Sequence, residues 1–249
     1  MDKKHIFITG GTSGIGLSLA EAYLKEGHHV GICGRDLSKI PEYMKDQYPF
    51  MHAYELDITD RNKVNEIIIN FSKGRLDLVI ANAGIASFKG NEIPDFDNVF
   101  GVINTNVLGV MSTIEASLKV MLPNHHGHIV VMSSVAGEIG LPRVGQYSAS
   151  KAAVTKYCEA LAIDLKKYNI TISTILPGFI DTPLTKVNTH YMPFLMSSEK
   201  ATRLIKKSID NKKIRYVFPL RMKCLVYVLS IMPRGMYRQL MRLVTPTLA

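Results

Sequence analysis

Short apolar runs alternate along the chain with longer stretches in which apolar residues recur every three or four positions. The short runs predict strands and the longer stretches predict helices. The predicted strands are His5–Thr9, His29–Cys33, Ala53–Leu56, Leu76–Ala81, His128–Ser133, Ile170–Leu176 and Arg215–Phe218. The predicted helices are Gly14–Gly27, Arg61–Phe71, Val102–Met121, Tyr147–Lys167 and Ser198–Ile209, with a shorter helical stretch at Leu37–Tyr43.

Several predicted strands, such as Ile129–Met132, are apolar nearly throughout instead of alternating with polar residues. This pattern is typical of parallel strands that are covered on both faces. Together with the alternation of strands and helices, it predicts an α/β fold with a Rossmann-type, doubly wound parallel sheet. We expect a single domain over residues 1–219, followed by a C-terminal helical extension over residues 220–249. Ligands of such sheets bind beyond the carboxyl ends of the strands.

Composition agrees with one globular domain, since 47% of the 249 residues are hydrophobic and 20% are charged. The three cysteines, Cys33, Cys158 and Cys224, lie far apart, which argues against a disulfide framework and a zinc site. A basic start leads only into the short apolar run Ile6–Ile8, and no uninterrupted apolar segment is long enough to span a membrane. We therefore expect a cytoplasmic protein. The histidines of His125-His126-Gly127-His128 are expected in a solvated turn, with no metal site.

The net charge of +9 is concentrated in the last fifty residues. From Lys200 onward the chain has twelve Lys or Arg and one acid, Asp210, a balance of +11, so the first 199 residues sum to −2. Apolar residues recur in the same region at helical spacing, at Met222, Leu225, Val226, Leu229 and Met232. One interpretation is an amphipathic helix that covers the domain or a subunit interface. A second is a helix that lies peripherally on the inner face of an anionic membrane. Nucleic acid is disfavoured, because no binding motif is present.

The first predicted strand runs directly into a glycine-rich turn that opens the first helix. A tight turn favours glycine, and a helix N-terminus offers backbone N–H groups to a phosphate. This placement indicates a dinucleotide site at Gly10, Thr12, Ser13, Gly14, Ile15 and Gly16. A turn of small residues without a ligand is the alternative.

The residues after the second strand indicate which dinucleotide is bound. In this fold an acid binds the ribose 2′-OH of NAD, whereas an Arg accommodates the 2′-phosphate of NADP. Here the first side chain available is Arg35, which follows Gly34. Asp36 is placed to cap the helical stretch that follows it. We therefore favour NADP(H) over NAD(H), with Thr12 or Ser13 contributing a hydroxyl to the same phosphate.

Five motifs, taken in order, resemble the classical short-chain dehydrogenase/reductase family over residues 5–185. They are the spacing T-G-x-x-x-G-x-G from Thr9, Asn82-Ala83-Gly84, Asn106 in Asn-Val-Leu-Gly, Ser134 followed by Tyr147-Ser-Ala-Ser-Lys151, and Pro177-Gly178 with Thr182. The resemblance implies a catalytic tetrad of Asn106, Ser134, Tyr147 and Lys151. Spacing to Tyr147 favours Ser134 over its neighbour Ser133.

The resemblance also implies how the cofactor is held. Asp57 would contact the adenine, with a simple turn residue as the alternative. Asn82, Ala83 and Gly84 would lie under the cofactor, with Asn82 mainly a structural tie. Lys151 would hold the nicotinamide ribose, and Pro177, Gly178 and Thr182 would hold the nicotinamide end. The family implies a homo-oligomer formed through the two long helices.

The residue types suit the transfer of a hydride to a carbonyl or from an alcohol. A phenol has a pKa of about 10 and is a weak acid or base at neutral pH. Lys151 lies one helical turn from Tyr147, so we expect its ammonium to lower the pKa of the phenol. Tyr147 would be the general acid in reduction and the base in oxidation, while Ser134 stabilises charge on the substrate oxygen. Asn106 would support a water that relays the proton.

The substrate is expected to be apolar. The predicted substrate loop, residues 183–198, is rich in large apolar side chains, namely Leu184, Val187, Tyr191, Met192, Phe194, Leu195 and Met196. We predict an NADPH-dependent reductase of apolar carbonyls, or the reverse dehydrogenase. The alternative is a nucleotide-binding sensor or scaffold with little turnover, which would have no need of all four tetrad residues.

Overall fold

The predicted strands form one parallel sheet in a computed structural model, which describes residues 3–86, 93–185 and 192–244. The sheet has seven strands in the order β3-β2-β1-β4-β5-β6-β9. Their bounds are β1 His5–Thr9, β2 His29–Gly34, β3 Met51–Glu55, β4 Leu78–Ala81, β5 Gly127–Met132, β6 Ile170–Pro177 and β9 Arg215–Phe218. Two further strands, β7 (Ile180–Asp181) and β8 (Met196–Ser197), pair with each other and were not predicted. The predicted Rossmann-type fold class is confirmed.

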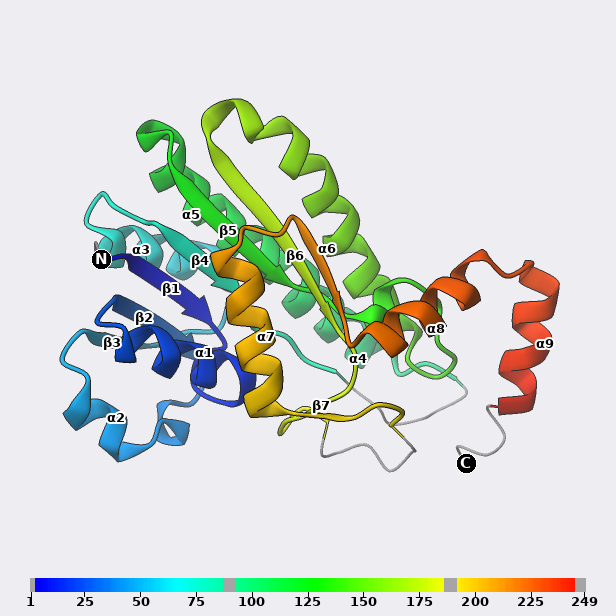
Figure 1. The fold of residues 1–249 in the computed structure, drawn as a ribbon. Helices are drawn as coiled ribbons and strands as arrows, with labels where there is room; N and C mark the ends of the chain where they lie inside the picture. Colours follow the sequence, from blue (N-terminus) through cyan, green and yellow to red (C-terminus); the bar gives the residue numbers. More distant parts are fainter. Residues whose placement is uncertain (1–2, 87–92, 186–191, 245–249) are drawn as a thin grey trace.

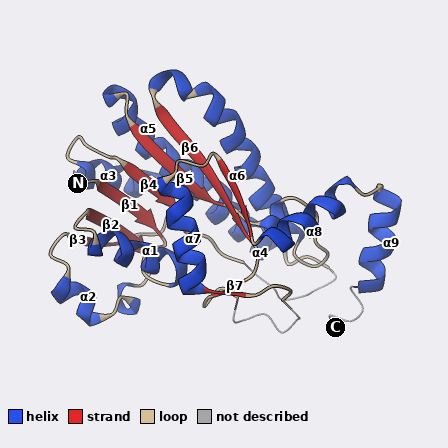
Figure 2. Cartoon of the chain, in the orientation of Figure 1, coloured by secondary structure: helices blue, strands red, loops and turns tan. Residues whose placement is uncertain are grey.

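Helices cover both faces of the sheet (Figures 1 and 2). On one face lie α3 (Arg61–Ser72), α5 (Val110–Asn124) and α6 (Gly145–Asp164), and on the other lie α1 (Gly14–Lys25) and α7 (Ser198–Asp210). A hydrophobic core lies on each face of the sheet, and successive side chains of a strand point to alternate cores. Phe7 packs under α3, whereas Ile6 and Ile8 pack under α1. Burial on both sides explains why these strands are continuously apolar.

The chain reverses its direction of travel across the sheet between β1 and β4, which are neighbours. Strands β2 and β3 lie on one side of β1, whereas β5, β6 and β9 lie beyond β4. Loops that leave adjacent strands on opposite sides of this switch point separate and open a crevice at their carboxyl ends. Because β1 and β4 are neighbours, the turn after Thr9 and the loop after Ala81 both start at the mouth of this crevice.

The expected single helix over Val102–Met121 is wrong in its start and in its regularity. Helix α4 begins earlier (Phe96–Ile103), where the Asp95 side chain accepts a hydrogen bond from the backbone N–H of Asn98. A π-helical segment, Asn104–Gly109, then separates α4 from α5. A π turn inserts one extra residue and is frequent at functional sites. Here it carries Asn106.

Two smaller expectations also change. The stretch Leu37–Tyr43 is not one helix, because a 3-10 turn, Leu37–Lys39, ends before Pro41 and helix α2, Glu42–Gln47, begins after it. Asp36 caps the 3-10 turn by accepting from the backbone N–H of Ser38, as expected. His128 does not lie in a solvated turn, because it is buried in β5 and hydrogen bonds to Ser173 over 2.8 Å.

The C-terminal extension forms two helices, α8 (Leu220–Ile231) and α9 (Arg234–Val244), which stand at one end of the sheet (Figure 1). Pro233 separates them, because proline has no N–H to continue a helix. The Tyr237 hydroxyl donates to the carbonyl of Gly140 over 2.6 Å and fixes α9 to the loop after β5. The boundary at residue 219 stays a prediction.

Among the described residues, the helical stretch Phe96–Asn124 alone is long and apolar enough to cross a membrane by length and composition. Half of its apolar window is buried, and its Ile114, Ala116 and Met121 lie in the core beside the sheet.

Candidate active site

The turn between β1 and α1 is shaped by glycines. Gly10 and Gly14 have φ of +63° and +54°, which favours residues without a Cβ. A Cβ on Gly16 would run into the carbonyl oxygen of Gly10 and lie 2.6 Å from Asn82 Nδ2, and one on Gly10 would lie 2.8 Å from Ala83 Cα. The turn therefore packs closely against the loop after β4, and it leads directly into the N-terminus of α1.

Asn82 ties this turn to the end of β4. Its Nδ2 donates to the carbonyls of Thr9 and Gly10, each over 3.1 Å. Thr9 returns the contact, since its hydroxyl oxygen accepts from the backbone N–H groups of Asn82 and Ala83. The geometry is that of a structural tie. The reciprocal role of Thr9 was missed, although a Thr that closes β1 is visible in the sequence.

Arg35 is exposed at the end of β2, and none of the ion pairs formed by described residues involves it. Its neighbour Asp36 is occupied differently. The Asp36 carboxylate accepts from Ser38 and lies 3.4 Å from Lys39, and the hydrogen bonds from Ser38 lower its pKa. An acid engaged in capping is poorly placed to bind a ribose, and the expected role of Arg35 at the adenosine end stays a prediction.

Asp57 forms a turn of its own at the end of β3. Its Oδ1 accepts from the backbone N–H and the hydroxyl of Thr59, both over 2.9 Å. This is the simple turn role that was the alternative for Asp57, and contact with adenine stays a proposal.

The four tetrad residues come from separate parts of the chain and converge in space. The Tyr147 phenol hydrogen bonds to Ser134, and the Lys151 Nζ lies 5.7 Å from the centroid of the Tyr147 ring. A Cβ on Gly84 would lie 3.2 Å from Asn106 Oδ1 and 3.4 Å from Lys151 Nζ, so Gly84 lies between these two groups. The fold thus gathers residues that the sequence places after strands or on one helix face.

Ser133 and Ser134 point to different surroundings. The Ser133 hydroxyl is buried, donates to the carbonyl of Lys151 and hydrogen bonds with the hydroxyl of Thr155. Ser134 caps a short 3-10 turn and also reaches Tyr147. Ser134 is therefore the serine that faces the phenol, in agreement with the spacing.

Burial dominates the electrostatics of the pair on α6. It raises the pKa of the Tyr147 phenol, and the hydrogen bond to Ser134 partly opposes the rise. Burial lowers the pKa of Lys151 to about 8, and its Nζ donates to the carbonyl of Met132 over 2.9 Å. The expected lowering of the phenol's pKa by the lysine is not seen: burial outweighs the Ser134 hydrogen bond and raises that pKa.

Asn106 lies in the π turn and is fixed by three hydrogen bonds to residues outside that turn. Its Oδ1 accepts from the N–H of Ile85, and its Nδ2 donates to the carbonyl of Ile85 and to the Ser150 hydroxyl over 3.1 Å. Ser150 in turn donates to the carbonyl of Tyr147 over 2.8 Å. Ser150 thus joins Asn106 to the helix that carries Tyr147 and Lys151. It was missed, although it stands inside the Tyr-x-x-x-Lys motif.

Replacing Ser150 by Ala should lower turnover several-fold while leaving NADPH affinity unchanged. The change removes the link between α6 and the π turn, and the lost hydrogen bond should cost about 1 kcal/mol of stability. Separate measurements of kcat, KM and thermal unfolding check this. Ser117→Ala is the control, since Ser117 is equally buried and bonds only within its own helix. Equal losses of turnover in both variants would contradict a positioning role for Ser150.

The residues expected at the nicotinamide end are Pro177, the last residue of β6, and Gly178 and Thr182 in the loop after it. Gly178 donates its N–H to the carbonyl of Phe218, and a Cβ there would lie 3.1 Å from Met222 Cγ. Thr182 is buried and lies beside Gly14. A Cβ added to Gly14 would be 3.8 Å from the Cβ of Thr182. The loop after β6 therefore meets the glycine turn after β1, as one cofactor lying across the switch point requires.

Only part of the predicted substrate loop is described, and Val187 and Tyr191 lie outside the described residues. In the described part Met196 is buried, whereas Leu184, Phe194 and Leu195 are 40%, 42% and 47% exposed. The expected apolar surface is present at these three positions.

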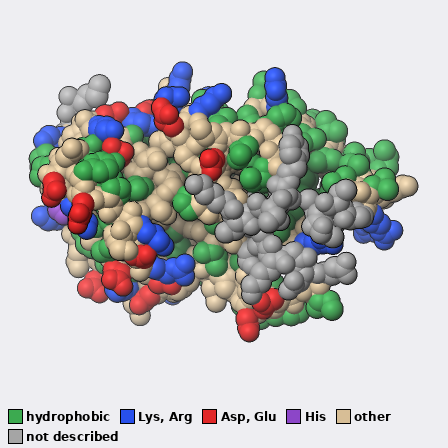
Figure 3. Space-filling model, turned by 90° about the horizontal axis from the view of Figure 1, so that it is seen from below, with side chains coloured by type: hydrophobic (Ala, Val, Ile, Leu, Met, Phe, Trp, Pro, Cys, Tyr) green, Lys and Arg blue, Asp and Glu red, His purple; other side chains and the backbone are tan. Residues whose placement is uncertain are grey.

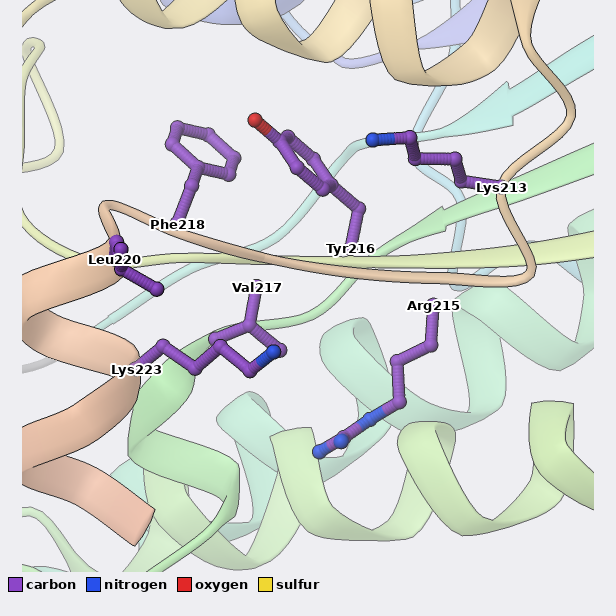
Figure 4. A pocket seen from close by; sticks show the side chains of 7 residues that line it. All are labelled: Lys213, Arg215, Tyr216, Val217, Phe218, Leu220 and Lys223. Atoms are coloured by element: carbon purple, nitrogen blue, oxygen red, sulfur yellow. The ribbon is translucent and has the colours of Figure 1, made fainter.

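A cavity of about 420 Å³ lies apart from the tetrad, along the outer edge of β9. Figure 4 shows Arg215 and Lys223 on one side of the strand and Lys213, Tyr216 and Phe218 on the other. Arg215 pairs with Glu138 over 2.6 Å. This basic hollow borders α8 and contains none of the predicted site residues. No group of three or more potential metal ligands occurs among the described residues.

The chain was compared with known protein families and structures. The model of the short chain dehydrogenase family matches residues 4–192. An uncharacterized oxidoreductase of Myxococcus xanthus is 32% identical over 243 residues, which cover 95% of this chain and 96% of that protein.

Two solved structures are also similar. A short chain dehydrogenase from Burkholderia cenocepacia in complex with NADP has a TM-score of 0.83 at 22% identity, covers 96% of this chain and 98% of its own, and matches it in fold. A variant of ElxO with NADPH bound has a TM-score of 0.75 at 32% identity, and covers 87% of this chain and 96% of its own. With the family model matched over most of its length, the chain belongs to the short chain dehydrogenase family and is an oxidoreductase that depends on a nicotinamide cofactor.

Proposed function

We propose that the protein is an NADPH-dependent reductase of apolar carbonyl compounds, or the dehydrogenase of the corresponding alcohols. The observation that carries the proposal is the convergence of Ser134, Tyr147 and Lys151 beside the crevice at the switch point. A nucleotide sensor would need the glycine turn but not a phenol, a hydroxyl and an amine gathered around one point.

The residues present fit a nicotinamide dinucleotide. The glycine turn with two left-handed glycines opens α1, whose N-cap Ser13 makes no capping hydrogen bond with its side chain. Backbone N–H groups of Gly14, Ile15 and Gly16 would hold the pyrophosphate. Asn82, Ala83 and Gly84 would lie beneath it, and Pro177, Gly178 and Thr182 would hold the nicotinamide. NADPH, when bound, supplies the hydride.

The protein's own groups manage the proton and the charge. Ser134 donates a hydrogen bond to the substrate carbonyl and stabilises the oxyanion that develops. Tyr147 gives its proton to that oxygen in reduction and takes it back in oxidation. Burial raises the pKa of the phenol, so Tyr147 holds its proton at neutral pH and depends on the neighbouring ammonium of Lys151 to become a stronger acid. Lys151 uses one of its three N–H donors on the Met132 carbonyl, and the others would hold the cofactor ribose. Asn106 would support the water that relays the proton.

The test is NADPH consumption across a panel of ketones and aldehydes, graded from small and polar to long-chain and apolar, with NADH in parallel. We expect turnover with NADPH on the apolar members. Confirmed NADPH binding with no turnover on any member would favour the sensor instead. A preference for small, charged or sugar carbonyls would overturn the apolar substrate class.

Arg35 is proposed to choose NADPH over NADH. Replacing Arg35 by Ser should raise the KM for NADPH by one to two orders of magnitude, because a charge-assisted hydrogen bond contributes about 1.5–3 kcal/mol. The KM for NADH should change little. Lys39→Ser is the control, since Lys39 is also exposed and close by but pairs with Asp36. A parallel rise in both KM values would show that Arg35 does not contact the 2′-phosphate.

We further propose that the protein is a cytoplasmic homo-oligomer joined through the long helices. Exposed apolar side chains support this, since Leu108, in the π segment that leads into α5, is 53% exposed and Ile163 of α6 is 77% exposed. Peripheral membrane contact of residues 220–249, which their charge and apolar spacing predict, stays a prediction.

A further inference from the structure

Helix α8 is apolar on two opposite faces. Its inner face buries Met222 and Val226 against Val135 and Ile139 of the loop after β5. Its outer face carries an exposed row whose spacing i, i+7, i+8, i+11 places it along one side of the helix. The row consists of Leu220, Tyr227, Val228 and Ile231, which are 71%, 63%, 54% and 63% exposed. We name this row the outer α8 face.

Such a row is unusual on a helix that already has a buried side. A surface helix normally presents polar residues to water opposite its apolar stripe. Contiguous exposed apolar side chains on a soluble fold mark a place where something binds. Figure 3 shows hydrophobic side chains gathered at the end of the molecule that carries α8 and α9, with Lys and Arg beside them.

The charged residues of the segment that carries the outer α8 face have one sign. After Asp210 the sequence contains eight Lys or Arg and no Asp or Glu. Arg221 and Lys223 flank the row on α8 and are exposed. On α9, Arg234, Arg238 and Arg242 are exposed and recur every four residues, so they share one face.

We propose that the outer α8 face binds the surface of an anionic phospholipid membrane. Its apolar row would enter the boundary between headgroups and acyl chains, while Arg221, Lys223 and the arginines of α9 contact the phosphates. With 12 residues, α8 is far too short to span the roughly 30 Å hydrocarbon core, so it lies in the membrane plane.

A second copy of the chain fits this surface less well. A two-fold interface pairs each patch with itself, so the cations that flank the apolar row would be brought together from both copies, with no acid of the row to offset them. Like charges that face each other across an interface disfavour association. An anionic bilayer accepts both the apolar row and the cations.

The surface adjoins the predicted substrate loop. The Arg221 guanidinium lies 6.0 Å from the ring centroid of Phe194, which is itself exposed, as is Leu195. Binding through the outer α8 face would therefore bring Phe194 and Leu195 to the lipid boundary. If the proposed reductase function holds, the protein takes its apolar carbonyl substrate directly from the bilayer.

The test is flotation of the full-length chain with phosphatidylcholine vesicles that contain or lack phosphatidylglycerol. We expect the protein to float with the anionic vesicles, weakly with neutral ones, and less as salt rises. Tyr227→Asp with Ile231→Asp should reduce the floated fraction at least about ten-fold. Ile69→Asp, an exposed apolar position on α3, is the matched control and should change nothing.

The contribution of charge is tested separately. Arg234→Glu with Arg238→Glu should weaken flotation by about ten-fold or more, since each cation near an anionic surface contributes about a factor of five. Lys45→Glu with Lys63→Glu alters the net charge equally at exposed positions of α2 and α3 and should have little effect. Equal losses in the two charge variants, or flotation that ignores lipid charge, would overturn the proposal.

Two further readouts separate the outcomes. Light scattering gives the mass of wild type and of the Tyr227→Asp, Ile231→Asp variant, and a lower mass in the variant without any vesicle binding by the wild type would assign the face to a second copy. Reduction of a ketone carried in the vesicles should fall in that variant, while reduction of a small soluble ketone stays unchanged. No reduction of any ketone, with flotation intact, would reject the reductase function and leave the membrane surface standing.

Discussion

Replacing Tyr147 by Phe should leave NADPH binding intact and lower turnover by about 10²–10⁴-fold, the usual contribution of a general acid or base. The ring of Phe keeps the packing of the site, but it has no proton to give to the developing alkoxide. The hydrogen bond between the phenol and Ser134 is also lost. Stopped assays of kcat and direct titration of NADPH check the two halves of the expectation.

The matched control is Tyr157→Phe, which removes a hydroxyl from an exposed tyrosine on the same helix, α6. It should retain full activity. Near-full activity in Tyr147→Phe would reject the proton-transfer role. Loss of NADPH binding would instead mean that the phenol matters for the cofactor and not mainly for the proton.

The sequence predicts the sheet and the cofactor turn well, because both depend on local signals. Strands buried on both faces are apolar in succession, and a strand-to-helix turn with left-handed backbone needs glycine. Ser134, Tyr147 and Lys151 were assigned from the resemblance to the family and not from local signals, and their catalytic roles stay predictions.

Other features depend on contacts that no local pattern contains. The π turn at Asn104–Gly109 leaves the surrounding apolar periodicity almost unchanged, and the Ser150 link to Asn106 joins residues 44 positions apart. Tyr237 meets Gly140 over 97 positions, so the docking of α9 could not be predicted. The hydrogen bond from Lys151 Nζ to the Met132 carbonyl likewise joins residues 19 positions apart, so the spacing between Lys151 and Tyr147 does not predict this orientation.

That orientation has a measurable consequence, because a buried lysine destabilises the fold when it is charged. The pKa of Lys151 is lowered from 10.5 to about 8 in the folded protein. Below pH 8 both the folded and the unfolded chain hold the proton, and the full cost of burying the charge, about 3 kcal/mol, weakens the fold. Between pH 8 and 10.5 the folded protein has released a proton that the unfolded chain still holds, so this contribution to stability rises with pH.

Lys151→Met should therefore stabilise the protein at neutral pH while it abolishes turnover. We expect a gain of about 2 kcal/mol at about pH 7, since the lost hydrogen bond to Met132 offsets about 1 kcal/mol, and a gain that shrinks toward about pH 10. Urea unfolding of wild type and variant at several pH values, in the absence of NADPH, measures the difference. Lys156→Met on the solvent side of α6 is the control and should show no such pH dependence.

The two results together decide what Lys151 is for. A variant that is more stable and inactive would mean that the wild-type protein keeps a destabilising charge because the reaction needs it, the trade expected at an active site. A variant that is less stable at every pH would mean that Lys151 mainly supports the loop at Met132. Lys151 would then not be the cation that assists proton transfer by Tyr147. A variant that is more stable and still active would show that the reaction does not need the charge of Lys151.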